Sequence, residues 1–396
     1  MVKPAKEIGA THTRVNIGPS HPAMHGALRV VADLDGETIV SAVSEIGYLH
    51  RGFEKHCEES MYTQCIPYTD RLNYVSSMSN NVGYCRAVEK LLGIEVPERC
   101  IMIRVMACEL NRIIDHLVCV GTNIVDIGAL TNFWYFFNVR EKIYKLIERM
   151  CGARLTTTYT RIGGLPRDLP EGFAGDLAEV LKDLDKALAE VSGLIAKNRI
   201  FIERTRNVGI VSAEDAIAWG YTGPCLRASG VNYDVRKAHP YYHYDQFQFD
   251  VPLGGNGDTY DRIVIRIEEM RQSARILEQA MDRLPDGPVS VDDPRVTLPP
   301  KEKVYGSIEG LMNHFMLVMN GVRPPAGEVY SITESPNGEL GFFIVSDGTG
   351  KPVRVRCRPP CFPIFSSFEK MIRGQMIADA IAVIGSLNII AGELDR

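Results

Sequence analysis

The chain contains 396 residues, of which 45% are hydrophobic and 23% are charged. These values are typical of a folded globular protein and argue against disorder and against a bundle of membrane-spanning helices. Lysine and arginine number 44 against 49 aspartate and glutamate residues, which gives a formal net charge of −5. Because no basic stripe is present, we expect no nucleic acid as a partner.

Ten cysteines are scattered along the chain, and no two of them form a CxxC pair. This pattern predicts buried, reduced thiols of a cytosolic protein rather than disulfides. Cys357 and Cys361 flank the run Arg358-Pro359-Pro360. Two isolated thiols fall short of the ligand set of a metal site, so we expect no metal.

The first predicted elements are two strands, 30–34 and 38–40, joined by Asp35-Gly36, which is a strong hairpin signal. Further along, residues 117–137 carry no lysine or arginine. Polar residues interrupt this stretch, so we expect a buried segment with one carboxylate, Asp126, rather than a membrane span.

Three long segments show the alternating three- and four-residue spacing of apolar positions that marks one face of a helix. They predict a bundle of packed helices as the core. The apolar positions are Ile103, Met106, Leu110, Ile113 and Leu117 in the first segment, Leu177, Leu181, Leu184, Leu188, Val191 and Ile195 in the second, and Ile263, Ile267, Met270, Ala274, Leu277, Met281 and Leu284 in the third.

Five prolines make residues 285–300 a loop. A helix is expected over 307–320, followed by an antiparallel sheet with strands at 329–333, 340–345 and 353–356. A last helix is predicted to begin at Ser366, because Glu369 stands three residues later at capping-box spacing.

Three polar clusters are candidate sites. A Gly/Pro loop carries His21 and His25, which suits hydrogen bonding to a ligand better than metal binding. Arg71 and Tyr74 lie at the expected start of a helix, and an ordinary amphipathic helix start accounts for them as well. Residues 223–237 alternate Asp and Arg in a predicted loop and indicate a packed ionic network. Spacing alone leaves open whether that network is structural or catalytic.

Several long runs, spread over nearly the whole chain, resemble the D subunit of NADH-quinone oxidoreductase, the proton-pumping respiratory complex I. They are GPSHPAMHGALR (18–29), IGYLHRGFEK (46–55), RVMACELNRIIDHL (104–117), RIGGLPRDLPEGF (161–173), LRASGVNYDVRKAHPY (226–241), FDVPLG (249–254), DRIVIRIEEMRQS (261–273), GEVYSITESPNGELGFFIVSDG (327–348) and GELDR (392–396).

This family is related to the large subunit of nickel–iron hydrogenases. The relationship implies an α+β fold with a hydrogenase-like helical bundle core and small antiparallel β regions at both ends. We expect an N-terminal β region lining the quinone site (1–65), a helical core (66–300) and a C-terminal α/β region (301–396), merged into one domain. Hydrogenases hold their metal with two CxxC motifs, which this sequence lacks, so hydrogenase chemistry is not expected.

The resemblance assigns roles to single residues. His25 matches the histidine that hydrogen-bonds a quinone carbonyl, and Tyr74 matches the tyrosine on the other side of the headgroup. Asp126 matches the carboxylate that pairs with this histidine. Arg51 and Arg71 match arginines beside the terminal iron–sulfur cluster, which the neighbouring B subunit binds.

One position departs from the family pattern. Many members carry a histidine near the cluster just before the RIGG run, where this sequence has Thr156. A threonine takes up no proton. The pH-dependent tuning of the cluster potential attributed to that histidine is therefore not expected here.

The resemblance implies the quinone-reducing subunit of complex I, peripheral to the cytoplasmic side of a bacterial inner membrane. A quinone would receive two electrons and two protons, with His25 and Tyr74 as proton donors, coupled to proton translocation. No cofactor is expected to be bound permanently by this chain, since NADH and the iron–sulfur clusters belong to other subunits. The expected partners are the B, C and H subunits of the complex.

Two alternatives stay open. The chain is the equivalent subunit of a complex I relative with a different electron donor, or it is a non-catalytic hydrogenase-like scaffold that only docks the cluster protein. In the scaffold interpretation, His25, Tyr74 and Asp126 are ordinary core residues.

Overall fold

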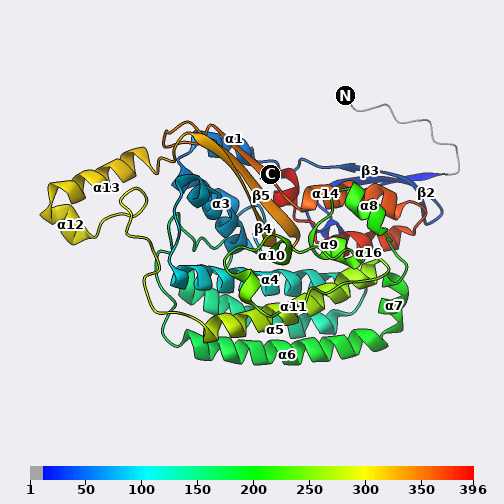
Figure 1. Cartoon of the computed structure of the whole chain (residues 1–396). Coiled ribbons are helices and arrows are strands. Elements are labelled where there is room, and N and C mark those ends of the chain that lie inside the picture. Colours follow the sequence, from blue (N-terminus) through cyan, green and yellow to red (C-terminus); the bar gives the residue numbers. More distant parts are fainter. Residues whose placement is uncertain (1–11) are drawn as a thin grey trace.

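The computed structural model describes residues 12–396. At its centre lies helix α4 (Glu98–Asp126), which packs against α5 (Leu130–Cys151) and α11 (Thr259–Asp282). Helix α6 (Phe173–Lys197) lies along α5 and closes the bundle on the lower side of the molecule in Figure 1. The apolar stripes predicted for the first two segments are buried in this core. The predicted bundle is therefore confirmed.

The apolar stretch 117–137 is not one continuous segment. Helix α4 ends at Asp126, and Gly128, with a φ of 99°, turns the chain into α5. Glycine suits this left-handed backbone because it has no Cβ. The turn places Asp126 at the tip of α4. Among residues 12–396, no helix combines the length and the apolar character that crossing a membrane requires.

The predicted N-terminal hairpin is confirmed within a three-stranded antiparallel sheet of β1 (Thr13–Ile17), β2 (Arg29–Asp35) and β3 (Thr38–Glu45). Alternate residues of β2 are buried, since successive side chains of a strand point to opposite faces. They share an apolar core with four helices near the other end of the sequence: α14 (Cys361–Ser366), α15 (Phe368–Ile372), α16 (Ile377–Leu387) and α17 (Ala391–Asp395).

The prediction of a last helix beginning at Ser366 is wrong. Ser366 is the final residue of α14, and the next helix begins at Phe368. The carboxylate of Glu369 accepts a hydrogen bond from the backbone N–H of Ser44 at 2.6 Å. It therefore ties α15 to strand β3 instead of closing a capping box.

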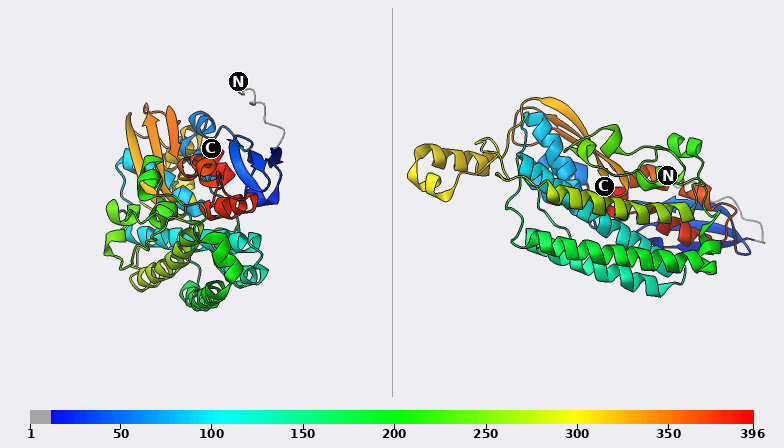
Figure 2. Two further views of the ribbon diagram at one scale, coloured as in Figure 1. Left: turned by 90° about the vertical axis from the view of Figure 1, so that its right-hand side faces the viewer. Right: turned by 60° about the horizontal axis from the view of Figure 1, so that its bottom comes forward.

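The second predicted sheet is also confirmed. It contains β4 (Gly327–Ser335), β5 (Gly338–Ser346) and β6 (Arg354–Arg358), paired antiparallel in that order. Its apolar residues pack on three helices from the first quarter of the sequence: α1 (Phe53–Glu59), α2 (Tyr62–Thr69) and α3 (Ser77–Leu92). Both sheets thus bring segments together that are distant in the sequence (Figure 2). With two small sheets beside a helical bundle, the α+β fold is confirmed.

Short helices connect these bodies: η1 (Pro22–Met24), α7 (Arg199–Thr205), α8 (Ala213–Ala218), α9 (Gly223–Ala228), α10 (Val235–Ala238) and η2 (Tyr244–Gln246). The segment 223–237, predicted as a loop, thus contains α9 and α10. Its predicted ionic network is confirmed. Arg227 lies 2.7 Å from Glu269, and Arg236 lies 2.7 Å from Asp234, with all four side chains buried. Pairing is what makes such buried charges tolerable.

Helices α12 (Lys301–Gly306) and α13 (Ile308–Asn320) pack on each other and extend away from the rest of the molecule as an arm, residues 301–320 (Figure 1). Helix α13 matches the helix predicted at 307–320. Most of its apolar side chains are exposed: Ile308, Leu311, Met312, Phe315, Met316, Val318 and Met319.

Candidate functional site

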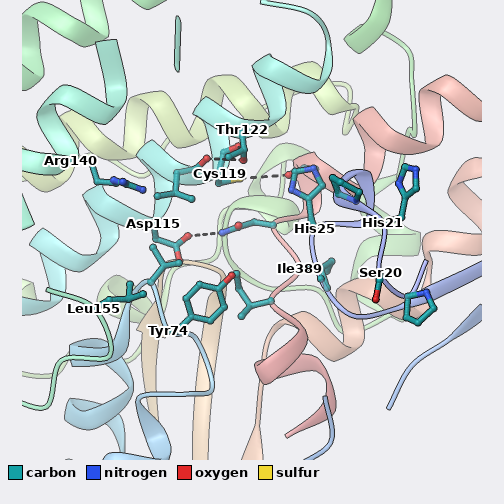
Figure 3. Close-up of a pocket in the computed structure, with 18 of the residues that line it drawn as sticks. Ser20, His21, His25, Tyr74, Asp115, Cys119, Thr122, Arg140, Leu155 and Ile389 are labelled. Carbon is teal, nitrogen blue, oxygen red and sulfur yellow. Dashed lines mark hydrogen bonds between the residues drawn. The ribbon is translucent and has the colours of Figure 1, made fainter. Parts of the chain in front are cut away.

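A cavity of about 750 Å³ lies beside the tip of α4. Six parts of the chain build its wall: the Gly/Pro loop, the turn before α3, the last turns of α4, helix α5, the segment after α5, and the segment that begins at the end of α16. Figure 3 shows how side chains from these distant segments surround one space. Its charged and polar lining includes His21, His25, Tyr74, Asp115, Thr122, Arg140, Tyr144, Arg154 and Asn388.

His25 is presented to the cavity by an unusual backbone. The turn η1 ends at His25, whose φ of 54° is left-handed, a region where histidine is several-fold enriched over most residues. Its Nε2 lies 2.6 Å from Oδ2 of Asp126. The two side chains are 19% and 24% exposed, so the pair lies at the cavity edge and keeps some access to solvent. The structure thus brings together the histidine and carboxylate that the resemblance paired.

Tyr74 lines the same cavity. It lies in the turn between α2 and α3 and not at the start of a helix, because α3 begins only at Ser77. The preceding residue, Asn73, fixes this turn by accepting a hydrogen bond from the backbone N–H of Val75 at 3.1 Å. Partial burial raises the pKa of the Tyr74 phenol, and the charge of Asp115 raises it further. The phenol therefore keeps its proton at neutral pH and is a hydrogen-bond donor.

Asp115, on helix α4, also lines the cavity that His25 and Tyr74 line. One of its carboxylate oxygens accepts a hydrogen bond from the amide of Asn73 at 2.8 Å, and the other accepts one from Asn388 at 2.5 Å. The side chain is only 1% exposed. Asp115 thus joins the Tyr74 turn to the segment that follows α16, and the cavity wall is held as one unit.

Arg51 and Arg71 lie together although 20 residues separate them. The guanidinium of Arg51 donates to the carbonyl oxygens of Arg71 and Gly392, both at 2.9 Å. Desolvation lowers the pKa of Arg51, the nearby carboxylate of Asp395 opposes this, and the charge of Arg71 lowers the pKa further. The side chain of Arg71 is half exposed. Neither arginine lines the cavity, and Arg71 is only three residues from Tyr74.

Thr156 also adopts a left-handed backbone, with a φ of 51°. Its hydroxyl donates to the carbonyl of Leu155, a cavity-lining residue, at 2.7 Å. Two residues later, Thr158 donates to Asp70. Burial raises the pKa of Asp70 to about 6, against the opposing effect of its hydrogen bonds and of Arg71.

Cys357 and Cys361 are both buried. The Cys361 thiol donates to the carboxyl of Glu393 at 2.7 Å. Within residues 12–396, no group of three or more His, Cys, Asp or Glu side chains is arranged to hold a metal ion.

Sequence reasoning missed three charged residues of the cavity, Asp115, Arg140 and Arg154. Asp115 lies within a run that carries the family resemblance. It falls outside the apolar stripe of its helix, and an ordinary solvated carboxylate would give the same sequence pattern. Arg140 belongs to a charged stretch of α5 with no distinguishing motif. Only the packing of α4 against α5 places Asp115 and Arg140 at the same cavity.

A family model and three relatives show what this chain is similar to. The family model described as "Respiratory-chain NADH dehydrogenase, 49 Kd subunit" matches residues 126–396. The C/D subunit of NADH-quinone oxidoreductase from Bdellovibrio bacteriovorus is 56% identical over 99% of this chain and 70% of its own length. The D subunit from Myxococcus xanthus is 54% identical, over 96% of this chain and 92% of that protein. The D 1 subunit from Sorangium cellulosum is 53% identical, over 96% and 95%. The chain therefore belongs to the D-subunit family of NADH-quinone oxidoreductase and is a subunit of such an oxidoreductase complex.

Proposed function

We propose that this chain binds and reduces a quinone in the 750 Å³ cavity, as the quinone-reducing subunit of a proton-translocating NADH-quinone oxidoreductase. The observation that carries the proposal is that a histidine paired with a carboxylate and a neutral phenol line one cavity. A quinone has two carbonyl oxygens, and its reduction to a quinol requires one proton at each of them.

The geometry supports separate tasks for the two donors. The Asp126 carboxylate holds the His25 imidazole at 2.6 Å, so we assign His25 as the donor to one carbonyl oxygen. Tyr74 is a neutral donor whose phenol hydrogen-bonds the other carbonyl oxygen. Because phenolate is disfavoured at its partly buried site, the proton that Tyr74 gives up must be replaced rapidly.

The remaining parts of the reaction belong to neighbouring subunits. We place the electron donor, an iron–sulfur cluster, in the B subunit, facing the surface that carries Arg51 and Arg71. The C and H subunits are the other expected neighbours, and the chain is peripheral to the cytoplasmic side of the bacterial inner membrane. This chain holds no cofactor permanently; its own residues bind the quinone and deliver protons.

Tyr74→Phe tests the proposal in the assembled complex. The variant keeps the ring and removes one hydroxyl, so assembly should be unaffected. Electron transfer from NADH to quinone should fall by about 10²-fold, a typical contribution of a general acid, while NADH oxidation by ferricyanide persists. The matched control is Tyr305→Phe on the arm, where the side chain is 88% exposed, and it should leave both activities unchanged. Equal loss of both activities in Tyr74→Phe would favour the scaffold alternative.

A further inference from the structure

The cavity contains a cation that the proposed reaction has not used. Arg140 lines it from helix α5. Its Nε is buried and has no hydrogen-bond partner among the described residues. The other cavity arginine, Arg154, is paired with Glu141 at 2.7 Å and with Glu148 at 3.7 Å. Arg140 makes no comparable ion pair within residues 12–396, so its charge is not neutralised by a direct contact there.

Aromatic rings hold Arg140 in place. The centre of its guanidinium lies 3.8 Å from the ring centroid of Phe137 and 5.1 Å from that of Tyr144. These residues are one turn before and one turn after it on α5, where side chains share a helix face. A stacked guanidinium uses its flat face for the rings and keeps its N–H groups, which point outward from its edge, free to donate. The stack therefore orients Arg140 without consuming its hydrogen-bonding capacity.

The carboxylate and the histidines of the wall are already engaged. Asp115 accepts hydrogen bonds from Asn73 and Asn388. Burial raises the pKa of the nearby Tyr144 phenol, Arg140 lowers that pKa, and Asp115 raises it. His25 is paired with Asp126. His21 uses its Nδ1 to accept from the backbone N–H at the start of η1. Arg140 is thus the guanidinium of this wall that is free to meet a bound anion.

We propose that Arg140 is the anion-binding residue of this cavity, and that the site prefers quinone-like rings whose oxygen carries negative charge. This inference rests on the proposed function. When electrons reach a bound quinone before protons do, the negative charge resides on its oxygens. A weakly hydrated guanidinium in a partly closed cavity stabilises that charge until His25 and Tyr74 deliver protons. No bond is formed to Arg140, and it gives up no proton.

The test compares two ligands that differ in charge and little in shape. One is a hydroxynaphthoquinone that is ionised at neutral pH, and the other is its neutral methoxy analogue. Each is used as a competitor of quinone reduction by the purified complex. With Arg140 present, the ionised ring should bind about tenfold more tightly, which is the size of one hydrogen bond to a charged group.

Arg140→Gln should reduce this preference to about onefold, since it removes the charge and keeps a hydrogen-bond donor. Arg140→Lys keeps the charge and should retain a clear preference for the ionised ring. Arg199→Gln is the control, because this exposed arginine on α7 does not line the cavity, and it should leave the ratio unchanged. The ligand ratio is the decisive readout, because a merely structural role of Arg140 in the aromatic stack would not change it.

Two results with the variants overturn the inference: an unchanged ratio in Arg140→Gln, or a loss of the ratio in Arg140→Lys as complete as in Arg140→Gln. The second would mean that the planar guanidinium, and not its positive charge, sets the ratio. Failure of the proposed function is distinguishable from both. In that case neither analogue competes with quinone in the wild-type complex, whereas competition by both analogues with equal affinity contradicts only the role of Arg140.

Discussion

The Nε2 atom of His25 lies 2.6 Å from Oδ2 of Asp126, 101 residues further along the chain. The contact joins an N-terminal loop to the tip of the central helix. A histidine and a carboxylate this close share a hydrogen bond, so replacing either one leaves the other without its partner.

We therefore predict that His25 and Asp126 are coupled in quinone reduction. His25→Asn, chosen because asparagine also tolerates the left-handed backbone at this position, and Asp126→Asn should each lower the rate by about 10²-fold. The double variant should lose little more than either single variant, as residues that act together do. Rates of quinone reduction, normalised to ferricyanide reduction, provide the measurement. Losses that multiply fully in the double variant would show that the pair does not act jointly.

Arg71 should face the iron–sulfur cluster of the neighbouring subunit. A positive charge about 10 Å from a cluster, at an effective dielectric constant of ~20, stabilises the reduced state by ~1.7 kcal/mol. Arg71→Met should therefore lower the midpoint potential of that cluster by about 70 mV, or abolish its electron paramagnetic resonance signal. Arg199→Met, at an exposed arginine on α7, is the control. An unchanged potential and signal would contradict this assignment.

Thr156 offers a gain-of-function experiment. Its backbone is left-handed, which is costly for a β-branched residue and easier for histidine. Thr156→His should therefore fold at least as well as the natural chain. It should also make the midpoint potential of the neighbouring cluster fall with rising pH around neutrality, because a protonated imidazole favours the reduced state and loses its charge as the pH rises. Redox titrations at several pH values give the measurement, and a pH-independent potential in the variant would refute the expected proximity.

Glu393 should change protonation near neutral pH. Its carboxyl is buried, one of its oxygens has no hydrogen-bond partner within the described residues, and burial raises its pKa from 4.5 to about 7, although hydrogen bonds from Cys361 and Asn337 oppose the shift. The folded chain therefore holds a proton that the unfolded chain releases above about pH 4.5. The contribution of Glu393 to the free energy of unfolding should fall by on the order of 3 kcal/mol as the pH rises from about 4.5 to 7.

Glu393→Gln should remove this pH-dependent loss. The variant should also lack a protonated carboxylic-acid band that infrared difference spectra of the wild type show below about pH 7 and lose above it. Glu309→Gln, at a residue in the first turn of α13 on the arm, should leave the band unchanged. A wild-type spectrum identical to that of Glu393→Gln over this pH range would show that Glu393 is ionised throughout.

Short sequence patterns predicted several helices and strands of the fold correctly. The helices α4 and α6 were predicted from the spacing of their apolar residues, and the hairpin was predicted from the Asp35-Gly36 turn. Both signals lie in residues that are close together in the sequence. The capping box predicted at Ser366 is wrong for the opposite reason. A long-range hydrogen bond from Ser44 takes the carboxylate of Glu369, and no local pattern contains that partner.

The candidate site divides in the same way. His25, Tyr74 and Asp126 came from a family resemblance, and the structure adds the contact and the cavity that join them. Asp115 and Arg140 had no local signal, because a carboxylate or guanidinium on a helix is ordinarily solvated. Their significance depends on a wall assembled from α4, α5 and the segment after α16, which only tertiary packing specifies.

The arm formed by residues 301–320 has a practical consequence for handling the protein. Its helix α13 exposes seven large apolar side chains, among them Phe315 at 54% and Ile308 at 77% exposure, on a projection away from the bundle. Contiguous apolar surface of this kind promotes self-association when its natural neighbours are missing. Overproduced without the other subunits, this chain should therefore aggregate or require chaperones. Replacing Leu311 and Phe315 with glutamate should give a more soluble chain for study in isolation.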